Sequence, residues 1–203
     1  DADPTNDENV KLVYSRKSYA KSNHDSTGWN REHVWPKSYG VGYSGADYSD
    51  LLSLRAADWN VNSARNNLYF DNVVCEYDDT HCDRPAHSEA HNTTAKTSQK
   101  FMPPESQRGD IARSIFYMAT RYDGSDDDAN CEKLTIGVCP CQYTYTMGNL
   151  SALRQWHHDD PPSAEEKLRN EINCLNFQGN RNPFVDNATL VEKIWSVLAA
   201  NDT

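Results

Sequence analysis

NREHVWPKS, residues 30–38, places an arginine, a glutamate and a histidine side by side ahead of a Trp-Pro pair. The run EHVWP within it predicts one strand, and DLLSLR, residues 50–55, predicts a second. Between them KSYGVGYSGADYS, residues 37–49, is rich in Gly, Ser and Tyr and predicts a loop. The following AADWNVNSARNN, residues 56–67, contains neither Gly nor Pro and predicts a helix. The predicted order is therefore strand, long loop, strand, helix.

A histidine at the end of one strand that faces an asparagine on the next helix suits cleavage of a phosphodiester bond. The imidazole of His33 can take a proton from water because its unperturbed pKa lies near neutral pH. Attack on phosphorus builds up negative charge, which a divalent cation bound through oxygen ligands neutralises. Mg²⁺ keeps several waters and needs few protein ligands, so Glu32 and Asn67 are the predicted pair. Two other asparagines are alternatives to Asn67 in this role: Asn66 is its neighbour, and Asn62 lies about one helical turn away.

An arginine is the predicted phosphate ligand of such a site. The planar guanidinium matches phosphate oxygens and stays charged at every relevant pH. The nearest candidates in sequence are Arg31, Arg55 and Arg65. Arg65 has a structural alternative, which is to pair with an acid such as Asp58 or Asp71.

Several separated motifs resemble the endonuclease I family of periplasmic and secreted non-specific nucleases, which belong to the ββα-metal (His-Me finger) group. The resemblance covers most of the chain from about Asn30 to Asp186. It rests on NREHVWPKS, LRAADWNVNSARNNLYFD, RGDIARSIFYMATRY, LRQWHHDDP and QGNRNPFVD, which occur in that order. The resemblance implies an α+β fold, a mixed domain in which a ββα-metal catalytic core at about residues 30–70 is surrounded by helices.

The resemblance also implies roles for the clustered residues. His33 is the expected general base that activates water, while Glu32 and Asn67 are expected to hold one Mg²⁺, with Mn²⁺ or Ca²⁺ able to stand in its place. Family members cut DNA and RNA with little sequence preference and leave 5′ phosphates. One departure is visible: where a His pair before LRP is expected, this chain has LLSLRA, residues 51–56. This leaves the role of Arg55 open and shifts weight toward Arg31 or Arg65.

The composition of the whole chain is compatible with this reading. A length of 203 residues favours a single domain over 1–203, and we expect a monomer. The net charge of −10 argues against a polyanionic partner at first sight. However, between Lys11 and Gly40 there are six basic residues and two acidic ones, so one basic groove for nucleic acid is still expected. No apolar run approaches the roughly 20 residues of a membrane span.

Cysteines and glycosylation motifs predict a secreted or extracellular protein, or a periplasmic one if the source is bacterial. The chain starts with Asp1 and has no apolar leader, which suggests a removed signal peptide. Disulfides are favoured over a metal site for the cysteines, and together with the sequons they favour a eukaryotic secreted form. The six cysteines, which allow 15 pairings, are Cys75, Cys82, Cys131, Cys139, Cys141 and Cys174. The four Asn-x-Ser/Thr sequons are at Asn92, Asn149, Asn187 and Asn201.

Apolar spacing predicts three helices later in the chain. The first runs from a capping Asp110 to Tyr122, with Arg113 turned away from the core. The second begins at a capping box formed by Ser163 and Glu166.

The third predicted helix begins at Asp186 or Asn187. The residues predicted to face the core are, helix by helix, Ile111, Ile115, Ala119 and Tyr122; Leu168, Ile172 and Leu175; and Leu190, Ile194, Val197 and Leu198.

Two interpretations stay open at this level. Trp29, Trp35 and Trp59 are candidates for stacking on nucleobases, although core packing explains them equally well. A non-enzymatic alternative is a catalytically inactive secreted module that binds nucleic acid or glycan on the same scaffold. The intact His33 argues against that alternative.

Overall fold

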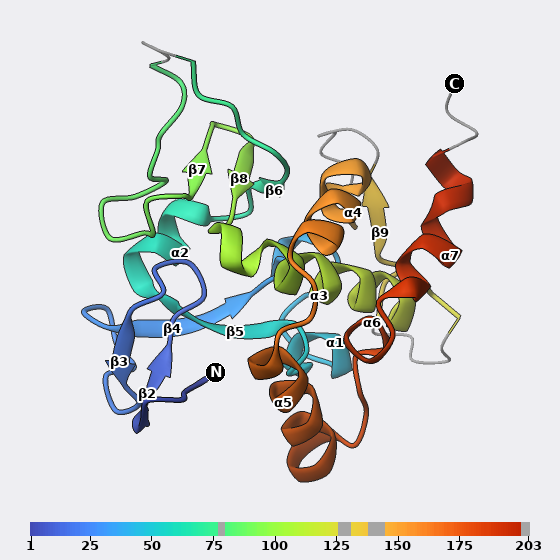
Figure 1. Ribbon diagram of the computed structural model, residues 1–203, viewed down its shortest axis with the longest axis horizontal. Coiled ribbons are helices and arrows are strands. Elements are labelled where there is room, and N and C mark those ends of the chain that lie inside the picture. The colour runs from blue at the N-terminus through green and yellow to red at the C-terminus, as the bar shows by residue number, and fades with distance from the viewer. Residues whose placement is uncertain (77–79, 126–130, 138–144, 200–203) are drawn as a thin grey trace.

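A computed structural model describes residues 1–76, 80–125, 131–137 and 145–199, the last four of these without their side chains (Figure 1). Helices and small sheets occur together, which confirms the predicted α+β class. The strands are β1 (Ala2–Asp3), β2 (Asn6–Lys11), β3 (Ser18–Ala20), β4 (Trp29–His33), β5 (Leu54–Asp58), β6 (Tyr69–Phe70), β7 (Ala95–Lys96), β8 (Lys100–Met102), β9 (Thr135–Gly137) and β10 (Thr146–Asn149). The α-helices are α1 (Ala46–Ser49), α2 (Trp59–Arg65), α3 (Arg108–Arg121), α4 (Leu150–Asp159), α5 (Ala164–Asn173), α6 (Pro183–Asp186) and α7 (Thr189–Ala199).

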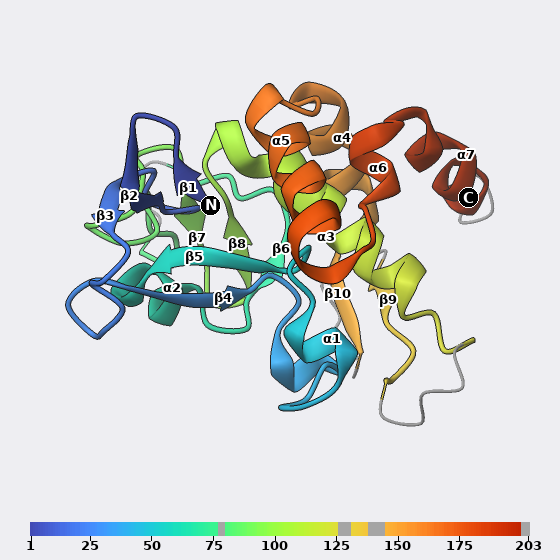
Figure 2. The same ribbon diagram turned by 90° about the horizontal axis from the view of Figure 1, so that it is seen from below.

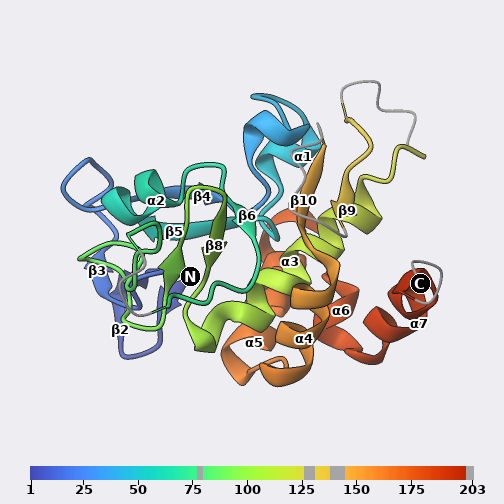
Figure 3. The ribbon, with the colours of Figure 1, turned by 90° about the horizontal axis from the view of Figure 1, so that it is seen from above.

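The predicted order of strand, loop, strand and helix is found in β4, β5 and α2, but with other bounds. The first strand was predicted at residues 32–36, whereas β4 ends at His33, and the predicted loop contains a 3-10 helix at Lys37–Tyr39 as well as α1. The first three residues of the predicted helix, 56–58, belong to β5. β4 and β5 pair antiparallel, and α2 follows β5 directly. Asp58 ends β5 and caps α2, because its carboxylate accepts hydrogen bonds from the backbone N–H groups of Asn60 and Val61. Figures 2 and 3 show this unit at one end of the molecule, with α7 at the other.

The boundaries of the second strand differ from the prediction, which placed it at residues 50–55. β5 begins only at Leu54, and residues 50–53 form a turn. The Asp50 carboxylate holds that turn, since it accepts from the backbone N–H of Leu52 and from the hydroxyls of Tyr117 and Tyr122.

Helix α3 is buried on nearly all sides, and the prediction that Arg113 turns away from the core was wrong. Arg113 is 0% exposed and donates two hydrogen bonds to the Glu166 carboxylate of α5, at 2.7 and 2.6 Å. The helix also begins three residues earlier than predicted, with Gln107 at the cap position, so Asp110 lies in its first turn and pairs with Arg113 at 3.2 Å. Ile111 and Ile115 are buried as predicted.

Helix α5 starts as predicted but packs through the opposite face. Ser163 caps it by accepting from the backbone N–H of Glu166. The residues predicted to face the core are instead exposed: Leu168 by 60%, Ile172 by 38% and Leu175 by 71%. The buried side chains of α5 are polar, namely Glu166, Asn170 and Asn173.

The last helix, α7, is partly as predicted. Leu190 is half-buried and packs against the core, whereas Ile194 is 45% exposed. Val191 and Trp195 take the core positions instead. The side chains of residues 197 and 198 lie outside the described part.

One of the predicted disulfides is present, between Cys75 and Cys82. Cys174 forms no disulfide with any described residue, and Cys139 and Cys141 lie outside the described ranges. Within the part of the chain that the structure describes, no helix has the length and apolar character needed to cross a bilayer.

Two of the sequon asparagines accept hydrogen bonds at the starts of helices. Asn149 accepts from backbone N–H groups at the start of α4, and Asn187 accepts from the backbone N–H and hydroxyl of Thr189 at the start of α7. Asn92 is exposed, and Asn201 lies outside the described residues.

Candidate active site

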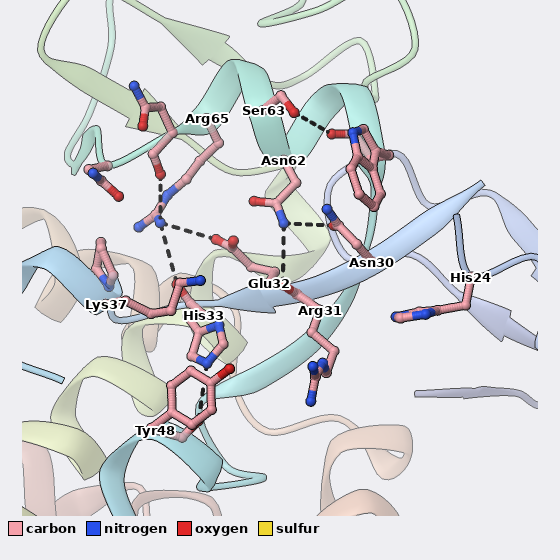
Figure 4. A pocket seen from close by; sticks show the side chains of 14 residues that line it. His24, Asn30, Arg31, Glu32, His33, Lys37, Tyr48, Asn62, Ser63 and Arg65 are labelled. Atoms are coloured by element: carbon pink, nitrogen blue, oxygen red, sulfur yellow. Dashed lines mark hydrogen bonds and ion pairs between the residues drawn. The ribbon is translucent and has the colours of Figure 1, made fainter. Parts of the chain in front are cut away.

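A cavity of about 440 Å³ lies between β4, α2 and the loop that joins β4 to β5 (Figure 4). It brings together five of the six residues predicted to carry the chemistry, namely Arg31, Glu32, His33, Arg65 and Asn67. The other lining residues are His24, Asn30, Pro36, Lys37, Tyr48, Trp59, Asn62, Ser63 and Asn66.

His33 ends β4 and is fixed by the loop that follows. Its Nε2 lies 3.0 Å from the backbone carbonyl oxygen of Tyr48, and its ring stacks on the Tyr48 ring with centroids 4.9 Å apart. A carbonyl can only accept, so Nε2 carries the proton and Nδ1 is left with a free lone pair. Burial lowers the pKa of His33 to about 4, and the charges of Lys37 and Arg31 act in the same direction. The imidazole is therefore neutral at neutral pH and able to accept a proton.

Glu32 points to the other face of β4, because successive side chains of a strand alternate (Figure 4). It is 3% exposed and accepts a hydrogen bond of 2.6 Å from the Tyr14 hydroxyl. Arg65 Nη1 lies 3.3 Å from the same oxygen, Oε1. Burial raises the pKa of the Glu32 carboxyl, while Arg65 and the Tyr14 hydroxyl oppose that rise.

Arg65 holds the ββα unit together, although it was predicted to bind the substrate phosphate. Its guanidinium donates to the backbone carbonyls of Asn66 at 3.0 Å, Val34 at 2.9 Å and His33 at 3.4 Å. It also lies over the Phe70 ring, 4.5 Å from the centroid, and is 1% exposed. With these donors committed, Arg65 is placed to position Glu32 and the end of β4 rather than to clamp a phosphate.

Arg55, predicted as a catalytic residue, does not line the cavity, although it lies opposite Glu32 in the register of β4 and β5. Its Nε donates to the Asp1 carboxylate at 2.9 Å, and its Nη2 donates to Gln107 Oε1 at 3.0 Å. Nη1 pairs with Asp110 at 3.5 Å. Arg31, in contrast, is exposed, lines the cavity and projects to the same side of β4 as His33 (Figure 4).

Similarity to known proteins assigns the chain to a family. Its residues 2–189 match the family model described as Endonuclease I. The chain belongs to the endonuclease I family. It is 41% identical over 201 residues to the extracellular ribonuclease of Bacillus amyloliquefaciens and 39% identical over 201 residues to that of Bacillus subtilis (strain 168). Each alignment covers 96% of this chain and 64% of the relative, so the chain spans less than two thirds of the length of these proteins.

The donor set of this endonuclease I cavity fits a hard divalent cation. Glu32 supplies a carboxylate whose two contacts both fall on Oε1, and exposed Asn67, which lines the same cavity, has an amide oxygen to offer. Asn66 turns the chain at the end of α2 with φ of 51°, which brings Asn67 toward the cavity. The described residues contain no group of three His, Cys, Asp or Glu side chains suited to a metal. Mg²⁺ does not require one, since it keeps several of its waters.

Tyr48, Asn30 and Ser63 line the cavity and were not foreseen, whereas Asn62, Asn66 and Trp59 had been named as candidates. Tyr48 supplies the carbonyl that sets the histidine tautomer, and it lies in a segment whose sequence predicted only a loop. Asn62 donates to Asn30 Oδ1 at 2.8 Å and so ties α2 to β4. The helical spacing of Trp59, Asn62, Ser63 and Asn66 is the signal that could have placed them on one face.

Proposed function

We propose that this endonuclease I family member is a secreted, metal-dependent, non-specific endonuclease that hydrolyses phosphodiester bonds of RNA and DNA to give 5′-phosphate products. The observation that carries the proposal is the placement of His33, whose Nε2 lies 3.0 Å from the Tyr48 carbonyl oxygen in a cavity that Glu32 and exposed Arg31 also line. The names of the two relatives, both extracellular ribonucleases, support RNA as a substrate and secretion as the localisation.

His33 is the general base of the proposed reaction. Its Nδ1 takes a proton from a water molecule as the oxygen of that water attacks phosphorus. The bond between phosphorus and the 3′ oxygen breaks, the 3′ oxygen takes a proton from solvent, and the phosphate stays on the 5′ side. A base that is neutral before the reaction and charged after it suits a site near a phosphate anion.

Glu32 and Asn67 are the residues that would hold Mg²⁺, with Mn²⁺ or Ca²⁺ as alternatives. The cation supplies charge neutralisation for the oxygens of the phosphate under attack. Arg65 and the Tyr14 hydroxyl orient the Glu32 carboxylate through the contacts to Oε1.

Arg31 binds the substrate phosphate in this proposal. It is the exposed guanidinium of the cavity, it sits two residues before His33 on the same strand, and Lys37 adds a second cation to the lining. We further propose that the catalytic unit, at about residues 30–70, works within one domain over 1–203 and as a monomer. The larger of two hydrophobic clusters among the described residues includes residues from Val13 to Trp195 and supports the one-domain arrangement.

The test is cleavage of supercoiled plasmid and of total RNA with Mg²⁺ and with excess EDTA. We expect cleavage of both polymers with Mg²⁺ and none with EDTA, and products that a 5′-phosphate-dependent exonuclease digests. His33→Ala serves as the inactive control. Binding of nucleic acid that is independent of metal, without any cleavage, would overturn the proposal in favour of an inactive binding module.

A further inference from the structure

Helix α2 presents a stripe of three exposed or half-buried side chains to the cavity, those of Trp59, Asn62 and Ser63, and Asn66, which ends the helix, lines the cavity as well. Residues spaced in this way share one helix face. A helix rises about 1.5 Å per residue, so the seven residues of α2 span about 10 Å, and Trp59 lies at the end opposite Arg65. The stripe therefore leads away from the end of the cavity where Glu32 and Asn67 lie and ends on an indole.

Trp59 differs from the other two tryptophans near the site. Trp35 is 0% exposed and belongs to the core. Trp29 is half-buried, with its ring edge-on to His24 at 4.6 Å and its Nε1 donating to the carbonyl of Ala20. Trp59 is 37% exposed and lines the cavity. Of these three, Trp59 alone offers ring surface to a molecule bound there.

The backbone that carries Trp59 is held in place. Its N–H donates to the carbonyl of Gly28 at 3.1 Å, and its carbonyl accepts from the Ser63 hydroxyl at 2.9 Å. Asp58, which caps α2, precedes it directly. A ring on a fixed backbone loses little freedom when a ligand stacks on it.

We propose that Trp59 is a nucleobase subsite, on which an unpaired base of the substrate strand stacks within about three nucleotides of the cleaved phosphate. The spacing follows from the distance of about 10 Å along α2 and the rise of about 3.4 Å per stacked nucleotide of one strand. This inference rests on the proposed nuclease function and adds a substrate class to it. Every base has a π face, so such a subsite is tolerant of sequence. A base pair hides the faces of its bases within the duplex stack, so the subsite favours single strands.

The test uses single-stranded oligonucleotides with one cleavable linkage, the other linkages being phosphorothioates. An abasic nucleotide is placed in turn at each of the three positions on either side of that linkage. We expect one position at which the abasic nucleotide raises the KM of the wild-type enzyme about tenfold to a hundredfold, the range of a lost base-aromatic stack. The kcat should change much less, because the base is remote from the reacting atoms.

Variants locate the effect on the indole. Trp59→Ala should raise the KM for the intact single strand by the same factor and should no longer respond to the abasic position, whereas Trp59→Phe should retain much of the wild-type response. For duplex substrate, Trp59→Ala should change KM less than threefold. Phe177→Ala is the matched control, since Phe177 is 69% exposed and lies on a different surface of the molecule, and it should leave both KM values unchanged.

The two proposals fail in different ways. If the wild-type enzyme cleaves the oligonucleotides but no abasic position alters KM, the stacking subsite is refuted and the nuclease function stands. The same holds if Trp59→Ala loses affinity equally for single and double strands. If the wild-type enzyme cleaves nothing, the proposed function itself is refuted.

Discussion

Replacing His33 with alanine should abolish most turnover without unfolding the protein, and His157 provides a closely matched control. Both histidines are buried, 9% and 6% exposed, and each places Nε2 against a backbone carbonyl, at 3.0 Å for Tyr48 and 2.9 Å for Ala188. Each truncation removes one buried ring and its hydrogen bond to a carbonyl, and His157→Ala also removes a contact of 3.5 Å between Nδ1 and Arg113, so each should cost about 1–3 kcal/mol of the free energy of unfolding. Only His33 lines the candidate active site.

The two variants should separate in activity. A positioned general base contributes about 10²–10⁴-fold, or about 3–5 kcal/mol of activation free energy. His33→Ala should therefore lose turnover by that factor, and His157→Ala should stay within threefold of wild type. Single-turnover cleavage of a fluorogenic oligonucleotide with saturating Mg²⁺ measures the turnover of each variant. Urea unfolding measures its free energy of unfolding. His33→Ala activity within tenfold of wild type, or equal loss in both variants, would refute the assignment of the base.

Three further predictions follow from individual contacts. Arg65→Lys should lower the free energy of unfolding by about 3 kcal/mol in urea titration, because a point charge cannot keep the hydrogen bonds to three carbonyls and Glu32; a loss below 1 kcal/mol would contradict this. Glu166→Gln should cost about 3–5 kcal/mol of the free energy of unfolding, because it removes the carboxylate that accepts two hydrogen bonds from buried Arg113 and leaves Asp110 as the other carboxylate partner, whereas Glu192→Gln, which breaks an exposed pair, should cost less than about 1 kcal/mol; equal losses would count against the comparison. Arg31→Gln should reduce the slope of log Kd against log salt for single-stranded RNA by about 0.7, the contribution of one phosphate contact; an unchanged slope in fluorescence anisotropy would argue that Arg31 faces no phosphate.

The sequence predicted the order of strands and helix around the site because strand, loop and helix-cap signals there all indicate the same order. Gly-rich residues 37–49 separate two strand-forming runs, and Asp58 marks the start of α2 by capping it. The order of the motifs pointed to the site residues. His33, Glu32 and Asn67 line one cavity, as expected. The role of the Tyr48 carbonyl could not be predicted, because every residue has a backbone carbonyl whatever its side chain.

The predictions failed where a buried face is polar. Apolar spacing placed Leu168 and Ile172 inward, but α5 docks through Glu166 and Asn170. Glu166 meets Arg113, which is 53 positions away in the chain, and Asn170 donates to the carbonyl of Asn182. A charged residue is predicted to be exposed unless a partner for it is known. A partner 53 positions away in the chain is determined only by the tertiary fold.

The adjacency of Glu32 and His33 has a physical consequence that the strand geometry explains. Side chains of neighbouring residues in β4 point to opposite faces of the two-stranded sheet that β4 forms with β5. Both Glu32 and His33 nevertheless line the cavity. The Glu32 carboxylate is thereby turned toward Arg65 and Tyr14 instead of the imidazole. A carboxylate beside the ring would raise the pKa of His33 and keep it protonated. The charges that act on His33 are those of cations, and together with burial they lower its pKa. The strand thus allows a candidate metal ligand and a neutral base to be consecutive residues without the first disabling the second.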